Sequence, residues 1–462
     1  MAKIKYNIPD NQFNGFPYGS KVNLKKDKDS LLTISGKTIK QLQDDGVFVF
    51  PPIPKNVDNE RPVFSLNVDS NNNCTFYTNN IVGFIGIDGV QLNIVSRFDF
   101  DFQSKNPISN NFLIYMLSRA AGLNINLVNL ESTNNNLDNF NLLELLFPKL
   151  LKEALSQGVY KEYKRVEHND CRVKGPIDIS RHIHNNIPFN GRLACHTREH
   201  SMDNKVTQLI RHTIEYIRQG KTIFKSILSN DQNTTAAIQK LCNITPSYNC
   251  MERRKVINAN LHNKISHPYY TKYTILQSLC LHILRGNKTS WGNGKTKLHG
   301  VLIDAAWLWE EYMAKVLSDN QSGLKHYVRT GHDFKLFRKD GNDFQQIIPD
   351  YYDEDNRIVA DAKYIPLDNT HHLNSDQASA VYYKTLVYML RFSCETGLLL
   401  FPSKKEIDPI SYDVIDTNYK LHKVGMKISN EQKYSNFVDS MLSEEYSFNN
   451  RIKLFLKNNS PY

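Results

Sequence analysis

Three residues in the last third of the chain, Asp350, Asp361 and Lys363, have the types and the spacing needed for hydrolytic chemistry. Residues 345–364 contain two extended runs joined by the acidic, polar segment 353–356. Asp350 and Asp361 are equally far from the point between Asp355 and Asn356, so a hairpin turning there places them side by side. Asp361 and Lys363 are two positions apart and therefore project from the same face of their strand. The sequence thus predicts two adjacent carboxylates beside one ammonium group.

This arrangement predicts metal-assisted phosphodiester hydrolysis. Two adjacent carboxylates repel each other unless a cation lies between them. Mg²⁺ fits, because it binds carboxylate oxygens and waters and leaves positions for phosphate oxygens, and we expect Mn²⁺ to substitute for it. The predicted metal ligands are Asp350, Asp361 and the backbone carbonyl of Ala362. Lys363 is expected to orient or deprotonate the attacking water and to offset charge that develops on the phosphate.

The elements around these residues distinguish the site from a surface hairpin with a solvated ion pair, which is the simpler interpretation of Asp-x-Lys alone. Pro349 precedes Asp350, and the apolar run 358–360 leads into Asp361. A segment with helical periodicity follows at 379–390, and an apolar strand at 397–402. Strand, turn, strand, helix, strand is the order of a PD-(D/E)xK nuclease core.

A helix is expected at 301–320, upstream of the hairpin, and it carries Glu310 and Glu311 at adjacent positions. Such a helix can direct one acidic side chain at a metal, and we take Glu310 as a further catalytic residue and metal ligand. The alternative is a solvated helix face whose neighbours Trp307 and Trp309 pack in the core. The spacing leaves open which of the two glutamates faces the metal.

The whole chain is predicted to be an α+β multidomain protein. Residues 1–135 form a β-rich domain, in which 82–98 is a hairpin turning at Asp88-Gly89. Residues 136–295 are mainly helical, because the apolar residues in segments such as 205–217 recur at helical spacing. Residues 296–462 form the α/β nuclease core, built around a central mixed sheet.

Charge and composition favour a polyanionic partner. The chain has 57 Lys and Arg against 47 Asp and Glu, a net charge of +10, which suits nucleic acid. No apolar run is long enough to span a membrane, so a cytoplasmic protein without a membrane partner is expected. The seven cysteines have no metal-ligand spacing and are expected to be reduced thiols.

Two other patterns are interpreted as carrying no chemistry. Gly294-Lys295-Thr296 resembles the end of a phosphate-binding loop, but Thr289 stands where its first glycine is required, so no nucleotide cofactor is expected. His182 and His184 alternate as in a strand, and His371 and His372 follow the catalytic strand; neither pair has a partner at metal-ligand spacing.

Beyond the nuclease residues, the chain resembles the McrC family, the nuclease subunits paired with McrB AAA+ GTPases. The resemblance extends over most of the chain from about residue 82 onward, in segments 92–100, 158–183, 198–217, 307–317 and 398–402. Within them, Asp203-Asn204 matches the family's Asp before Asn at a helix start, and Leu308-Trp309-Glu310 matches its Leu-Phe-Glu. Residues 1–80 match no family pattern.

The resemblance implies a division of labour. Residues 1–135 would dock on an AAA+ GTPase ring and stimulate its GTP hydrolysis, while the C-terminal domain would cut double-stranded DNA. Target recognition usually lies in the GTPase subunit, so both a methylated and an unmodified target stay open. The sequence departs from the family at Lys384, where a Gln is usual four residues before Tyr388, and at Lys174, where an Arg is expected. Lys384 and Tyr388 are taken as DNA contacts.

Two other functions remain as alternatives. One is a stand-alone PD-(D/E)xK nuclease of DNA repair or recombination, although no helicase motor accompanies the core and the first 280 or so residues exceed what a minimal nuclease needs. The other is a non-catalytic activator of the AAA+ ring with a vestigial site, against which the intact Asp350, Asp361 and Lys363 argue.

Overall fold

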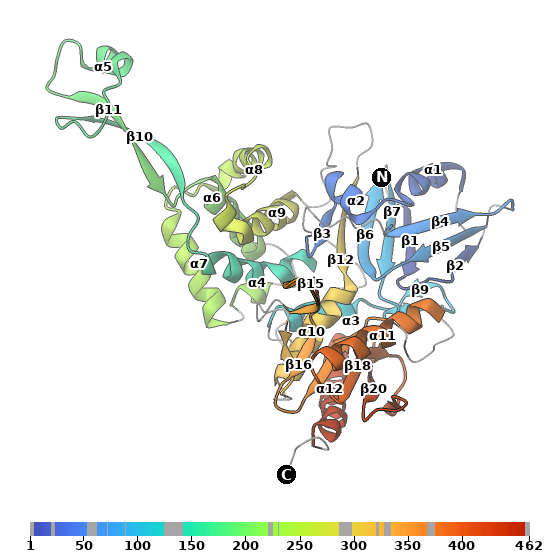
Figure 1. The fold of residues 1–462 in the computed structure, drawn as a ribbon. Coiled ribbons are helices and arrows are strands. Elements are labelled where there is room, and N and C mark those ends of the chain that lie inside the picture. Colours follow the sequence, from blue (N-terminus) through green and yellow to red (C-terminus); the bar gives the residue numbers. More distant parts are fainter. Residues whose placement is uncertain are drawn as a thin grey trace. The chain divides into compact units, whose positions relative to one another are not determined.

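The structure is a computed structural model of a mixed α/β protein with several sheets, as the sequence predicts. It falls into two compact units, residues 1–142 with 287–462, and residues 143–286 (Figure 1). The residues that it describes are 4–19, 24–52, 62–71, 73–87, 89–123, 142–219, 225–229, 231–285, 298–319, 323–327, 334–365, 367 and 375–457. The predicted boundaries at 135/136 and 295/296 stay predictions.

The N-terminal part of the first unit is built on a five-stranded sheet in the order β1-β7-β6-β12-β3. Its strands are β1 (Ile4–Pro9), β3 (Phe48–Phe50), β6 (Ile81–Ile87), β7 (Val90–Val95) and β12 (His299–Asp304). Beside it lie a three-stranded sheet, short helices and a small hairpin: β2 (Phe16–Gly19), β4 (Phe64–Val68), β5 (Cys74–Thr78), α1 (Leu24–Ile34), α2 (Ile39–Asp44), β8 (Phe100–Asp101) and β9 (Asn106–Pro107). The predicted 82–98 hairpin is confirmed, since β6 and β7 pair antiparallel with Ile87 opposite Val90; Asp88 lies outside the described residues.

Strand β12 is distant in sequence from the other strands of this sheet, and its presence corrects one prediction. Residues 301–304 were expected to begin a helix, but they belong to β12, which pairs with both β3 and β6. A short apolar run does not distinguish strand from buried helix by its periodicity, and its strand partners lie more than 200 positions away. Gly83 permits the close approach, because a Cβ there would overlap the carbonyl oxygen of Val301.

The C-terminal part of the first unit is a six-stranded mixed sheet in the order β13-β16-β17-β18-β20-β19. Its strands are β13 (Lys325–His326), β16 (Tyr351–Asp353), β17 (Ile358–Ala362), β18 (Thr396–Ser403), β19 (Ile410–Asp413) and β20 (Lys420–Lys427). A separate hairpin, β14 (Lys335–Lys339) with β15 (Asn342–Gln346), lies between β13 and β16 in the chain. The central strand β18 is buried along its whole length, as a strand covered on both faces should be.

Helices cover both faces of this sheet. Helix α11 (Ser375–Arg391) packs on the face that carries Val359. Helix α10 (Ala305–Asp319) packs on the other face, where the hydroxyl of Tyr351 donates to the carbonyl of Glu310. Helix α12 (Tyr434–Lys457) packs on β20 and on α10. The hairpin, the long helix and the buried strand therefore occur in the predicted order.

Helix α3 (Asn111–Ala120) joins the two parts of this unit, because it lies between α10 and α12. Glu445 of α12 is 3% exposed and accepts hydrogen bonds from the hydroxyls of Tyr115 at 2.7 Å and Tyr312 at 2.9 Å. Arg119 forms an ion pair with the same carboxylate at 2.6 Å. A buried carboxylate with three donors is fully satisfied, so α3, α10 and α12 form one packed assembly.

The second unit is helical and carries one projecting arm. Its helices are α4 (Leu142–Ser156), α6 (Lys205–Gln219), α7 (Gln232–Ile244), α8 (Arg253–His262) and α9 (Thr271–Arg285), with short 3-10 turns at Lys225–Ser229, Cys250–Glu252 and Pro268–Tyr270. Helix α4 contains Pro148 within its length. The middle region is therefore mainly helical, as predicted.

The arm consists of β10 (Glu162–Asp170), α5 (Ile179–Asn186) and β11 (Leu193–Ser201), and it projects from the helices of its unit (Figure 1). The prediction that His182 and His184 lie in a strand is wrong, because Asp178 caps a helix there by accepting from the backbone of Arg181. The arm exposes an unusual number of large apolar side chains: Tyr163, Val173, Ile177, Ile179, Ile183, Ile187 and Phe189.

The Asp203-Asn204 pair anchors the arm to the helices. The side chain of Asn204 donates to the carbonyl of Tyr160 at 3.0 Å and accepts from the backbone of Val206 at 3.0 Å. Asp203 accepts from the backbone of Ser247 at 3.0 Å. Asn204 thus caps the start of α6 and ties it to the chain before β10, and Asp203 ties it to Ser247, which follows α7.

Several sequence patterns fall outside the described residues: the polar segment 131–141, the Gly294-Lys295-Thr296 loop, and His371-His372. Within the part of the chain that the structure describes, no helix has the length and apolar character needed to cross a membrane.

Candidate active site

The hairpin that carries the site has the predicted register. Strands β16 and β17 pair antiparallel, with Tyr351 opposite Ala360, and the next pair in this register is Asp350 with Asp361. The turn is stabilised locally, because Asp353 accepts hydrogen bonds from the backbone and side chain of Asn356 at 3.0 and 2.7 Å. A polar turn that binds its own backbone fixes the register and so brings the two carboxylates together.

Asp350, Asp361 and Lys363 lie together at the end of β17. The backbone N–H of Ala362 donates to Oδ2 of Asp350 at 2.8 Å, which holds the first carboxylate beside the second strand. Asp361 is fully buried, and Nζ of Lys363 lies 2.5 Å from its Oδ2. No amide or hydroxyl donor among the described residues reaches Oδ1 of Asp361. A buried carboxylate oxygen without a donor is costly, and a cation would satisfy it.

The two carboxylates differ in their affinity for a proton. Burial raises the pKa of Asp350 well above its usual range, and the charge of Asp361 raises it further. Burial also acts to raise the pKa of Asp361, but the charges of Lys363 and Lys384 and hydrogen bonds from Asp350 and Lys363 together outweigh it, and the pKa is lowered. Of the two carboxyl groups, Asp350 therefore binds a proton more readily than Asp361.

Glu310 reaches this group from α10. Its charge contributes to the raised pKa of Asp350. The choice between Glu310 and Glu311 as a metal ligand stays a prediction. Oε1 of Glu310 lies 2.9 Å from Nε2 of His326.

The sequence analysis did not identify His326. It lies on the two-residue strand β13, opposite Tyr351, and its side chain is 9% exposed. A strand so short has no periodicity to detect, and its pairing with β16 is fixed only by the sheet. No residue type or spacing in the sequence signals this contact.

Helix α11 brings Lys384 and Tyr388 to the same place. The charge of Lys384 lowers the pKa of Asp361, and Nζ of Lys384 lies 5.4 Å from the centre of the Tyr388 ring. Burial raises the pKa of Tyr388, and the charges of Asp361 and Asp350 raise it further. Both side chains therefore interact electrostatically with the carboxylate pair; Lys384 is exposed and Tyr388 is buried.

The described residues contain no group of three or more His, Cys, Asp or Glu side chains arranged to hold a metal ion. The donors that come together around one position are the carboxylates of Asp350 and Asp361. Mg²⁺ needs no more protein side chains than this, since it keeps several waters and is often bound by one or two carboxylates.

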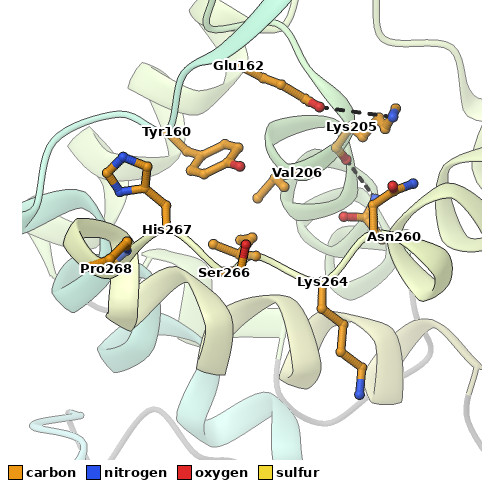
Figure 2. A pocket seen from close by; sticks show the side chains of 11 residues that line it. Tyr160, Glu162, Lys205, Val206, Asn260, Lys264, Ser266, His267 and Pro268 are labelled. Carbon is orange, nitrogen blue, oxygen red and sulfur yellow. Dashed lines mark hydrogen bonds and ion pairs between the residues drawn. The ribbon is translucent and has the colours of Figure 1, made fainter.

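A pocket of about 480 Å³ lies elsewhere, in the helical unit at the base of the arm (Figure 2). Glu162 and Lys205 form an ion pair at its edge, 4.0 Å apart, and Asn260 donates to the carbonyl of Lys205 (Figure 2). Its other lining residues include Tyr160, Lys264, Ser266 and His267. The charges of Glu162 and Lys205 are thus paired with each other, and Lys264 is exposed to solvent.

One family model and several solved structures are similar to this chain. A family model described as "McrBC 5-methylcytosine restriction system component" matches residues 77–402. A refined half-complex from a tetradecameric assembly of Thermococcus gammatolerans McrB AAA+ hexamers with bound McrC has 17% identity and a TM-score of 0.49, covering 95% of this chain and 99% of that chain. The cryo-EM structure of the Thermococcus gammatolerans McrBC complex has 19% identity and a TM-score of 0.33, covering 69% and 88%. No curated protein matches the chain.

Proposed function

Because the chain belongs to the family of McrBC 5-methylcytosine restriction system components, we propose that it is the subunit that cleaves DNA. The observation that supports this most directly is the pairing of Asp350 with Asp361, beside Lys363, at the end of a buried strand. We infer a PD-(D/E)xK core from Pro349-Asp350, Asp361-Ala362-Lys363 and the order of strands and helix around them. Family membership alone does not supply this activity; the residues do.

The donor set fits Mg²⁺. Among the described residues no amide or hydroxyl donates to the buried Oδ1 of Asp361, and the charge of Asp361 disfavours ionisation of Asp350, so a cation would relieve both. The proposed ligands are Asp350, Asp361 and the carbonyl of Ala362, with Glu310 as a further ligand, directly or through water. When bound, the ion would polarise the phosphate and lower the pKa of a bound water.

The side chains around the pair have separate proposed roles. Lys363, which is 20% exposed, would orient or deprotonate the attacking water and offset charge on the phosphate. His326 would hold Glu310 in place through their 2.9 Å contact. Lys384, which is exposed on α11, would contact the DNA backbone by its charge, whereas Tyr388 is 3% exposed and the DNA contact expected of it stays a prediction.

Metal dependence tests this function. Cleavage of double-stranded DNA should require Mg²⁺ or Mn²⁺ and should fail with Ca²⁺ alone, whose looser coordination positions the water poorly. The measurement is the rate of DNA cleavage by the chain with its GTPase partner, at equal ionic strength with each cation. Undiminished cleavage in excess chelator would refute a metal-dependent site.

We further propose that the partner is a McrB-like AAA+ GTPase ring. The family resemblance assigns docking to residues 1–135, and the arm supplies a second surface of suitable chemistry. Large apolar side chains exposed on one element mark a protein contact, and Ile183 (54% exposed) and Phe189 (68% exposed) lie at or next to α5. The described residues contain no chemistry of their own in the arm, which suits a binding role.

The alternatives make different predictions. A stand-alone repair or recombination nuclease would cut DNA at full rate without the ring. A non-catalytic activator would stimulate GTP hydrolysis equally well with or without the acidic pair. The buried and adjacent carboxylates favour the catalytic proposal over the second alternative, since an unused pair would carry an electrostatic cost.

A further inference from the structure

A buried polar cluster connects the end of the N-terminal sheet to the residue that follows Lys363. Strands β1 and β7 are parallel neighbours, so Asn11, shortly after β1, and Ser96, directly after β7, meet at the same sheet edge. Oγ of Ser96 lies 3.0 Å from the hydroxyl of Tyr364. Nδ2 of Asn11 donates to the backbone carbonyl of Tyr364 at 3.3 Å. The two bonds hold both the ring and the backbone of Tyr364.

Arg97 and Asp10 complete this cluster. The guanidinium of Arg97 lies 4.4 Å from the centre of the Tyr364 ring, which it faces as a cation. The backbone N–H of Arg97 donates to Oδ1 of Asp10 at 2.7 Å, and the two side chains form an ion pair at 3.8 Å. Asp10 is 0% exposed and Arg97 is 7% exposed. A buried ion pair adds little net stability, because desolvation offsets the attraction, so its effect here is to fix one geometry.

Lys363 depends on this geometry because it lies just beyond the last residue of β17, Ala362. Its backbone N–H donates to the carbonyl of Leu400 on β18 at 2.8 Å, which fixes the backbone of Lys363 against the sheet. The next residue, Tyr364, is held by its contacts with Asn11, Ser96 and Arg97. These contacts hold the backbone that follows Lys363, while the pairing of β17 with β18 and the bond from Ala362 to Asp350 hold the backbone before it.

We propose that Asp10, Asn11, Ser96 and Arg97 are positioning residues for the nuclease, acting through Tyr364 on Lys363. This inference rests on the proposed function. A displacement of about 1 Å at a reacting group lowers a rate by up to about a hundredfold, so a loosened Tyr364 reduces turnover without removing any catalytic group. The N-terminal sheet thus helps to position Lys363 in the cutting site.

The test is Tyr364→Phe, which removes the bonds to the hydroxyl and keeps the ring. Its matched control is Tyr312→Phe. Tyr312 is also fully buried in the same unit, and its hydroxyl donates to the carboxylate of Glu445. Both variants are assayed in the full chain with the GTPase partner, below their unfolding temperatures. The readouts are kcat and KM for DNA cleavage and the stimulation of GTP hydrolysis.

We expect Tyr364→Phe to lower kcat at least about tenfold with KM and GTPase stimulation unchanged, and Tyr312→Phe to keep the wild-type kcat. A wild-type kcat for Tyr364→Phe overturns the proposal, and so does an equal fall in both variants, which would reflect stability alone. Lys363→Ala serves as the reference for the site itself. If the wild-type complex cuts no DNA, or cuts as fast as Lys363→Ala, the proposed function fails and the positioning role with it.

Discussion

A chain carrying Asp361→Asn is expected to lose DNA cleavage by at least about a hundredfold, the size of effect seen when one preorganised electrostatic contact is removed from an active site. The amide has the shape of the carboxylate, so the packing around this fully buried residue is kept. It lacks the negative charge that would bind the cation and that pairs with Lys363 at 2.5 Å. Binding to the GTPase ring should be unchanged, because that surface lies elsewhere.

The measurement is single-turnover DNA cleavage, with stimulated GTP hydrolysis recorded on the same samples. Asp413→Asn is the matched control, since Asp413 lies on the same sheet but its side chain is 86% exposed. It should cut at the wild-type rate. If Asp361→Asn cuts DNA at the wild-type rate, the acidic pair has no role in catalysis. Loss of GTPase stimulation would show that the variant is misfolded.

Glu445→Ala is expected to lower the free energy of unfolding by about 3–5 kcal/mol, the cost of removing one partner of a buried pair. The hydroxyls of Tyr115 and Tyr312 lose this acceptor, and Arg119 keeps only its partly exposed ion pair with Asp319 at 3.0 Å. Because α3 belongs to the N-terminal part of the unit and α12 to the C-terminal part, both should unfold together. Chemical denaturation followed by circular dichroism measures this.

The neighbouring residue provides the control. Glu444 pairs with Lys427 at 3.1 Å, but that lysine is 40% exposed, so Glu444→Ala should cost less than about 1 kcal/mol. Equal losses for the two variants would mean that the buried network has no special role. A separate unfolding transition for the C-terminal part would contradict its packing on α3.

The acidic pair could be predicted from sequence because its geometry is local. Asp350 and Asp361 are joined by a single hairpin, and the strand period places Lys363 on the face of Asp361. The helix and buried strand that follow are also continuous segments whose apolar pattern is visible within one window.

The rest of the site depends on contacts between distant segments. His326 acts on Glu310 through a two-residue strand, and Tyr364 is held by residues more than 250 positions earlier. Strand β12 was mistaken for the start of a helix because its partners β3 and β6 lie more than 200 positions earlier. Pairing over such separations is decided by the whole sheet, and no single-sequence pattern specifies it.

We expect this chain to cut DNA only together with a GTPase ring. The most direct test records DNA cleavage and GTP hydrolysis with Mg²⁺ for the chain alone, the ring alone, both together, and the ring with a chain carrying Ile183→Asp and Phe189→Asp. We expect cleavage and accelerated GTP hydrolysis only with both wild-type components, and a large loss of both with the arm variant, because two buried charges oppose an apolar contact. Full-rate cleavage by the chain alone would contradict the dependence on the ring. Unchanged stimulation of the ring by the arm variant would contradict the arm as a docking surface.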